Sequence, residues 1–145
     1  MGAQTIVEET DKVDDLLEAA RYDDIDDLKS LASHGVSLNS RDSHGRTALH
    51  MAAANGHMTI VEYLISEGVD INALNEENNT PLHWAGLNGH IEVVKRLILA
   101  GASLSILNRY EQTPMDEAIR GGKMEIIDAI NTTVAQMELA NTTVT

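Results

Sequence analysis

The chain has 145 residues, of which 43% are hydrophobic but only 3% aromatic, and it contains no cysteine. This length suits one domain, and the lack of cysteine excludes disulfides, thiolate metal sites and cysteine nucleophiles. The formal net charge of −13 argues against binding to nucleic acids or anionic membranes, because Lys and Arg make most phosphate contacts. We recognise no signal peptide and no apolar run near the ~18 residues of a membrane span, so we expect a cytoplasmic or nuclear protein.

The first predicted element is strongly acidic. Residues 1–27 hold ten Asp and Glu residues against Lys12 and Arg21, so they carry 8 of the 13 net negative charges. We interpret this segment as a solvated cap on one end of the domain.

An internal repeat organises the rest of the chain. A shift of 33 residues aligns residues 47–50 (TALH) with 80–83 (TPLH) and with 113–116 (TPMD). A fixed period of this length is the signature of a stacked repeat architecture. The register predicts four units with a flexible segment at each end: residues 1–8, 9–41, 42–74, 75–107, 108–140 and 141–145.

Each unit reads as two helices, and residues 75–107 show the pattern best. Thr80 can cap the first helix, and Pro81 follows at a position where a missing N–H costs nothing. Gly89 ends that helix in a left-handed conformation. Apolar residues at helical spacing, such as Leu97, then predict a second helix that ends at Gly101.

The end units are expected to differ, because each has a neighbour on one side only. Asp27 occupies a column that is apolar in the other units, where Ile60, Val93 and Ile126 stand. We interpret this column as the face toward the preceding unit, which the first unit lacks. Val134 replaces the helix-ending glycine of the last unit, which predicts one long C-terminal helix that frays near Asn141.

The 33-residue period and the T-P-L-H-x-A pattern, best matched by residues 80–85, resemble those of the ankyrin-repeat family. The resemblance covers almost the whole chain. It implies an all-α solenoid of about four helix-turn-helix units with short β-turn or hairpin tips. It also implies a monomeric protein-binding module without catalytic residues, cofactor or metal.

Six histidines invite a metal-site hypothesis, but four of them occupy pattern positions of the repeat. In the resembling family the imidazole at the Leu-His position, here His50 and His83, is structural and ties units together. His57 and His90 follow helix-ending glycines, so we assign them to structure as well. The chain has neither a G-x-x-x-x-G-K-[ST] nor a G-x-G-x-x-G phosphate-binding motif, and we do not expect an enzyme.

Ligands of the family contact the turn tips and the inner face of the first helices. Five of the six arginines fall at such positions. They are accompanied by a predicted central apolar patch of Met51, Leu74, Trp84, Leu87 and Leu107. Trp, Tyr and Arg are the usual anchors of protein interfaces. The alternative for Trp84 is that it only fills space between first helices. The predicted partner-binding residues are Arg21, Tyr22, Arg41, His44, Arg46, Met51, Asn55, Leu74, Glu76, Glu77, Trp84, Leu87, Asn88, Leu107, Arg109, Tyr110 and Arg120.

One modification site follows from the resemblance. Some ankyrin repeats are hydroxylated on an Asn in the exit turn of the second helix. Leu64, Asp70 and Ile71 stand at the preferred positions before Asn72. These residues also satisfy the fold, which is the alternative explanation for the match.

Residues 47–57 and 79–90 are similar to segments of the fungal ankyrin-repeat chaperones that escort a small-subunit ribosomal protein. An acidic escort for a highly basic ribosomal protein would be electrostatically complementary to it. This chain lacks the longer connection between middle repeats and the acidic tail of those chaperones. A generic scaffold or adaptor in signalling or protein turnover is the alternative function.

Overall fold

The computed structural model describes the backbone of residues 2–144 and the side chains of residues 11–141. This part of the chain folds into helices without a β-strand, which confirms the predicted all-α repeat architecture. The helices are α1 (Gly2–Arg21), α2 (Ile25–Ser33), α3 (Ala48–Asn55), α4 (Met58–Ser66), α5 (Pro81–Leu87), α6 (Ile91–Leu99), α7 (Pro114–Arg120) and α8 (Met124–Val144).

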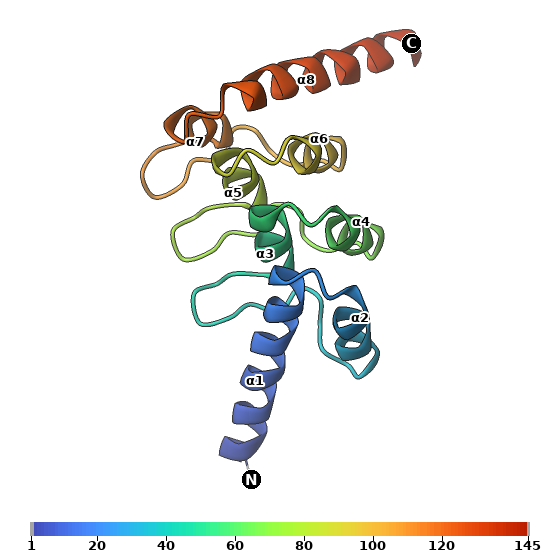
Figure 1. The fold of residues 1–145 in the computed structure, drawn as a ribbon, viewed down its shortest axis with the longest axis vertical. Coiled ribbons are helices and arrows are strands. Elements are labelled where there is room, and N and C mark those ends of the chain that lie inside the picture. Colours follow the sequence, from blue (N-terminus) through green and yellow to red (C-terminus); the bar gives the residue numbers. More distant parts are fainter. Residues whose placement is uncertain (1, 145) are drawn as a thin grey trace.

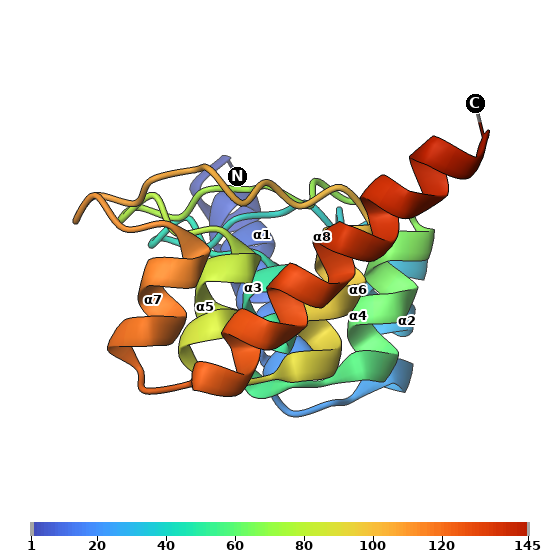
Figure 2. The ribbon, with the colours of Figure 1, turned by 90° about the horizontal axis from the view of Figure 1, so that it is seen from above.

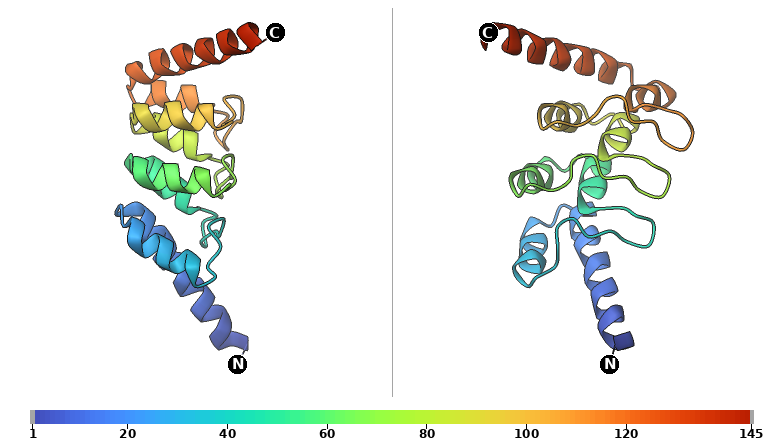
Figure 3. Two further views of the ribbon diagram at one scale, coloured as in Figure 1. Left: turned by 90° about the vertical axis from the view of Figure 1, so that its right-hand side faces the viewer. Right: turned by 180° about the vertical axis from the view of Figure 1, so that it is seen from behind.

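The helices form two rows along the long axis of the molecule (Figure 1). One row is the inner column, in which α1, α3, α5 and α7 each contact the next. The outer row of α2, α4 and α6 lies beside it (Figure 3). The segments that connect one unit to the next lie together on one side of the helices (Figure 2). No helix among the described residues is long and apolar enough to cross a membrane.

The first helices of the units begin as the sequence predicts. Thr47, Thr80 and Thr113 are the N-caps of α3, α5 and α7, and each side-chain oxygen accepts the backbone N–H three residues later. The side chain of that later residue accepts the backbone N–H of the threonine in return, which completes a capping box. Gly56 and Gly89 adopt φ of 73° and 77° just after α3 and α5, as predicted.

Small residues let the inner helices approach closely. Ala52, Ala53 and Ala85 are fully buried between them, while leucines such as Leu64 and Leu97 fill the space under the outer row. Gly121 shows how tight this contact becomes, because a Cβ built on it would lie 2.5 Å from the carbonyl oxygen of Leu87.

Three loops project past the inner column, and we call their tips fingers: residues 41–46, 74–79 and 107–112. Each finger is closed by a backbone hydrogen bond, such as that from Asn75 N–H to the carbonyl of Asn79 at 3.1 Å. Successive fingers are also linked, because Arg109 N–H donates to the carbonyl of Glu77 at 2.8 Å. The tips are therefore the expected turns, and their hairpin-like bonds do not extend into strands within residues 2–144.

The ends of the stack differ from the middle in the predicted way. Asp27 is exposed, whereas Ile60, Val93 and Ile126 in its column are buried. Ile126 lies next to Gly86 of the preceding unit, as expected for a column that faces backward along the stack. The long helix α8 packs against α6 and α7 at the open end.

The chain ends are more helical than the sequence suggested. Helix α1 includes residues 2–8, and α8 includes residues 141–144. The sequence predicts both segments to be flexible, and residues 1 and 145 lie outside the described residues. The helices extend because no glycine or proline interrupts residues 3–20 or 124–144.

Candidate partner-binding site

We define the inner surface as the exposed faces of the inner helices together with the three fingers. Several predicted binding residues project from it into solvent. Tyr110 is 62% exposed and Leu107 is 53% exposed, and both lie on the last finger. Tyr22 projects in the same manner at the end of α1. The structure therefore exposes more than half of each of these aromatic and apolar side chains to solvent.

The predicted apolar patch is smaller than expected, because Met51 does not belong to it. Met51 is only 5% exposed and forms part of the core. Helix α3 is flanked by α1 on one side and α5 on the other. The flexible Met side chain fills the space between neighbouring helices rather than projecting from them.

Trp84 is half-buried and packs across the boundary between units. Its ring meets the ring of His50 edge-on, with 5.4 Å between ring centroids. The space-filling explanation of Trp84 is therefore correct for part of the ring. The remainder stays accessible on the inner surface beside Leu87, which is also half-buried.

The arginines of the inner surface are largely engaged by the chain itself. Arg46 pairs with Asp42 at 2.7 Å, and Arg120 pairs with Glu117 at 2.7 Å. Arg41 donates to the carbonyl oxygen of Leu74. Burial would raise the pKa of Asp42, but hydrogen bonds from the side chain and backbone of Arg46 outweigh it and hold that pKa below its usual value.

Other predicted residues also make bonds within the chain. The amide of Asn55 donates to the carbonyl of Met51 at 2.8 Å, and that of Asn88 donates to the carbonyl of Ala54 at 3.0 Å. His44 and Glu76 lie 3.1 Å apart at the finger tips. The Arg21 guanidinium and that of Arg109 have no ion pair among the described side chains, and Arg109 is exposed.

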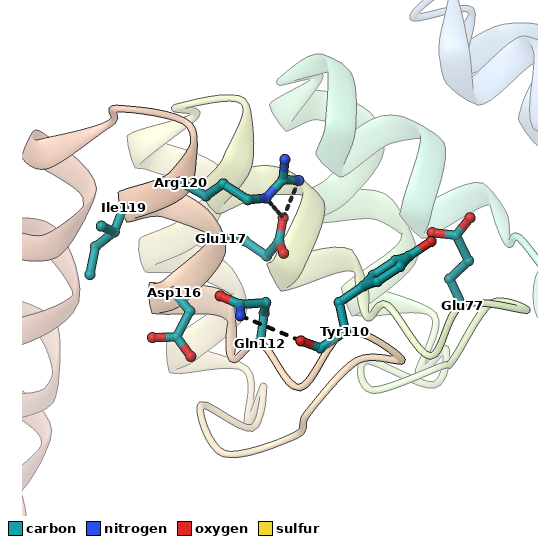
Figure 4. Close-up of a pocket in the computed structure, with 7 residues that line it drawn as sticks. All are labelled: Glu77, Tyr110, Gln112, Asp116, Glu117, Ile119 and Arg120. Carbon is teal, nitrogen blue, oxygen red and sulfur yellow. Dashed lines mark hydrogen bonds and ion pairs between the residues drawn. The ribbon is translucent and has the colours of Figure 1, made fainter.

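A hollow on the inner surface lies between the last two fingers and α7 (Figure 4). Its volume is about 650 Å³. Figure 4 shows the Tyr110 ring reaching from the last finger toward Glu77 of the preceding finger, with the Arg120–Glu117 pair alongside. The lining residues are Glu77, Tyr110, Gln112, Asp116, Glu117, Ile119 and Arg120.

Glu77, Tyr110 and Arg120 of this hollow are predicted binding residues, whereas Gln112, Asp116, Glu117 and Ile119 are not. Asp116 stands in the column of His50 and His83. It keeps their capping role, since its Oδ2 accepts Thr113 N–H at 2.9 Å. The described residues after α7 continue as α8 (Met124–Val144) and not as a finger, so they offer no acceptor for the second hydrogen bond that a histidine would make. The change from His to Asp in this column was the sequence signal that could have identified Asp116.

The histidines of the repeat confirm their structural assignment. The imidazoles of His50 and His83 contact the carbonyls of Asn79 and Gln112 at 2.8 and 2.9 Å, and those of His57 and His90 contact the carbonyls of Arg21 and Ala54 at 2.7 and 2.9 Å. Each imidazole thus links one unit to its neighbour. Within the described residues no three His, Asp or Glu side chains are grouped so as to hold a metal ion.

Asn72 also links units. Its side-chain oxygen accepts Ser103 N–H at 2.8 Å, and its amide nitrogen lies 3.4 Å from the carbonyl of Gly101. Its backbone N–H donates to Asp70. Both ends of the Asn72 amide therefore serve the fold, as the alternative explanation requires. Hydroxylation of its β-carbon stays a prediction.

A second hollow, of about 230 Å³, lies at the acidic end of the molecule. It is lined by Asp15, Glu18, Ala19, Tyr22, Asp24 and Asp27. All four carboxylates are exposed. The predicted acidic cap is thus a solvated surface beside Tyr22, continuous with the first inner helix.

The geometry defines a class: a helical repeat protein with an extended, partly apolar surface, in which every buried side-chain polar atom of the described residues has a hydrogen-bond partner. The family model described as "Ankyrin repeats (3 copies)" matches residues 16–108, more than half of the chain. The chain belongs to the ankyrin-repeat family.

Proteins of several kinds contain similar segments. The chain is 38% identical over 53 residues to acyl-CoA-binding domain-containing protein 1 of Arabidopsis thaliana, covering 37% of this chain and 16% of that protein. It is 49% identical over 49 residues to the L-asparaginase of Dirofilaria immitis, covering 34% of this chain and 8% of that enzyme. A putative ankyrin repeat protein of Acanthamoeba polyphaga mimivirus is 47% identical over 47 residues, which cover 32% of this chain and 6% of that protein.

These matches are partial. The chain spans less than a fifth of each of these relatives, and the match to the asparaginase falls within its ankyrin region. They therefore support the assignment of the repeat to the ankyrin family. They give no reason to assign an enzymatic activity to this chain. Ankyrin repeats are protein–protein interaction modules and are typically not catalytic.

Proposed function

We propose that this protein binds a basic segment of another protein along its inner surface. The observation that carries the proposal is the state of the arginines. Unpaired arginines would make this surface repel a basic partner. In the structure Arg46 and Arg120 are each neutralised by a carboxylate 2.7 Å away.

With these two arginines paired, half-buried carboxylates and exposed aromatic rings stand on the surface beside Arg21, Arg41 and Arg109, which have no ion pair among the described side chains. Glu77 and Asp116 line the hollow beside Tyr110, and the cap at α1 adds four more carboxylates beside Tyr22. The net charge of −13 favours the same kind of partner over long range. Charge of this kind mainly accelerates association, while apolar anchors slow dissociation.

The narrower form of the proposal is escort of a basic ribosomal protein before its assembly into the small subunit. It is supported by the resemblance of residues 47–57 and 79–90 to such chaperones and by the charge of the chain. None of the relatives named above is a ribosomal chaperone. Family membership alone supports the alternative, a generic scaffold or adaptor. For either role we propose a cytoplasmic or nuclear location.

The test is a titration of the purified chain with a Lys- and Arg-rich segment of a small-subunit ribosomal protein at two salt concentrations. Asp23→Asn, Asp24→Asn and Asp26→Asn together remove three exposed charges from the cap. Asn preserves the fold here, because it can cap α2 as Asp24 does and tolerates the φ of 61° at Asp23.

We expect micromolar binding in low salt, with slower association and a flatter salt dependence for the triple variant. The matched control neutralises three exposed carboxylates elsewhere, Glu67, Glu125 and Asp128. It should affect association less. No binding of the ribosomal segment at micromolar concentration in low salt would eliminate the escort role and leave the generic adaptor. Equal effects of the two triple variants would show that the cap has no special part.

A further inference from the structure

We propose that the hollow between the last two fingers and α7 receives one arginine side chain of the bound partner, with its guanidinium over the ring of Tyr110 and against the carboxylate of Glu77. This inference rests on the proposed function, because it names an anchor within the basic segment that the inner surface is proposed to bind.

Some hydrogen-bonding groups in the hollow remain unused. Both oxygens of Glu117 are occupied, one by Asn108 and the other by Arg120. The carboxylate of Glu77 makes no hydrogen bond or ion pair with any described side chain, and Asp116 uses one oxygen to cap α7. The Arg120 donors Nε and Nη2 are both directed at Glu117. The carboxylate of Glu77 and one oxygen of Asp116 can thus accept from an occupant rich in N–H donors.

The lining of the hollow has a net negative charge. Arg120 and Glu117 neutralise each other within the lining, which leaves the carboxylates of Glu77 and Asp116. The hollow therefore carries about two unit negative charges beside an open aromatic ring. Arg109 precedes Tyr110 on the same finger but does not line the hollow.

The ring of Tyr110 is open to a bound cation. Tyr110 is 62% exposed, and its ring extends toward Glu77 with no aromatic partner among the described residues (Figure 4). The chain already uses a cation over a tyrosine, since Lys29 Nζ lies 5.2 Å from the ring centroid of Tyr63. An arginine suits the hollow better than a lysine, because a planar guanidinium can stack on a ring while its edge bonds a carboxylate.

The experiment uses the full chain, labelled for NMR, and three tripeptides with blocked ends: Gly-Arg-Gly, Gly-Lys-Gly and Gly-citrulline-Gly. Citrulline has nearly the shape of arginine without its charge. The reporters are the side-chain amide of Gln112 and the ring of Tyr110. We expect the arginine peptide to move both signals with millimolar affinity, the lysine peptide to bind several-fold more weakly, and the citrulline peptide not to saturate.

The matched variants are Glu77→Gln and Glu76→Gln, which make the same chemical change at neighbouring finger positions. Glu76 lies against His44 rather than in the hollow. Tyr110→Ala is matched by Tyr22→Ala, a comparably exposed tyrosine at the other end of the stack. Loss of one exposed cation–π contact or one exposed ion pair corresponds to about a two- to fivefold weaker affinity. We expect that loss for Glu77→Gln and Tyr110→Ala and no change for the two controls.

Equal shifts with the arginine and citrulline peptides, or equal effects of Glu77→Gln and Glu76→Gln, would overturn the inference. Titration with the long basic segment distinguishes a failure of this inference from a failure of the proposed function. If that segment binds the wild type and the two hollow variants equally, the proposed function stands and the arginine site falls. If the tripeptide binds and the long segment does not, the proposed function falls and the site stands.

Discussion

The imidazole of His50 joins two units through its two nitrogen atoms: Nδ1 accepts Thr47 N–H at 3.1 Å, and Nε2 donates to the carbonyl oxygen of Asn79 at 2.8 Å. The first bond belongs to the cap of α3 and the second reaches the next finger. Both bonds together require a neutral ring with its proton on Nε2. His83 repeats the arrangement one unit later toward Gln112.

This geometry predicts a pH dependence of stability. Burial lowers the pKa of His50 to about 4 and lowers that of His83 as well. The unfolded chain takes up these protons near pH 6.5, while the folded chain resists them. Stability is therefore complete above about pH 6.5 and is lost as the pH falls toward 4, by about 3 kcal/mol for His50. Urea unfolding of the wild type and of His50→Gln between pH 7 and 4 measures it. Parallel curves for the two proteins would contradict the assignment.

The stacked arrangement predicts that substitutions at two outer-helix positions lower the free energy of unfolding by different amounts. Leu64 is fully buried under the outer row, and its replacement by Ala leaves a cavity that should cost roughly 2–5 kcal/mol. Asp27 is exposed on α2, so Asp27→Ala should cost much less. Denaturant unfolding compares the two directly. A comparable loss at Asp27 would show that its column is not an open end.

The sequence predicted the parts of this fold that depend on one residue and its near neighbours. The 33-residue register places Thr80 at a cap and Gly89 in a left-handed turn, and both are where the pattern requires them. The burial of Ile60 against the exposure of Asp27 followed from the same alignment. Such positions are set by local backbone geometry and by which face meets a neighbour.

The candidate site was less predictable, because it depends on side-chain choices between units. Met51 can lie in the core or on the surface from the same backbone position, and the sequence gives no sign of which. Arg46 and Arg120 are predicted binding residues, but both fold back onto carboxylates, four and three residues away. The hollow combines Glu77 and Tyr110, which are 33 residues apart and therefore share a column. Reading the columns together would have brought these two residues to one place.

Gly121 should not tolerate a methyl group. Its φ of −78° suits any residue, but a Cβ would lie 2.5 Å from the carbonyl oxygen of Leu87. Gly121→Ala should therefore force α5 and α7 apart and cost roughly 1–3 kcal/mol. Gly122→Ala is the control, since its Cβ meets nothing and only its φ of 72° opposes the change. Thermal unfolding of both variants measures the effect. A neutral Gly121→Ala would mean that the inner helices are packed less closely than described.

Removal of metal should not affect stability. The histidines that follow the repeat bond to backbone carbonyls, as His57 does to Arg21. Dialysis against a chelator is therefore expected to leave the melting temperature unchanged. A large fall that zinc restores would refute the structural assignment of the histidines.

Mapping the contact by NMR tests most directly whether a partner binds along the inner surface. The labelled chain would be titrated with a Lys- and Arg-rich protein segment. We predict that the indole of Trp84 and the signals of Leu107 and Tyr110 shift together and saturate at one affinity. Exposed residues of the outer helices, Glu67 and Leu99, should not move. Shifts confined to the outer helices, with Trp84 and Tyr110 unchanged, would contradict the account.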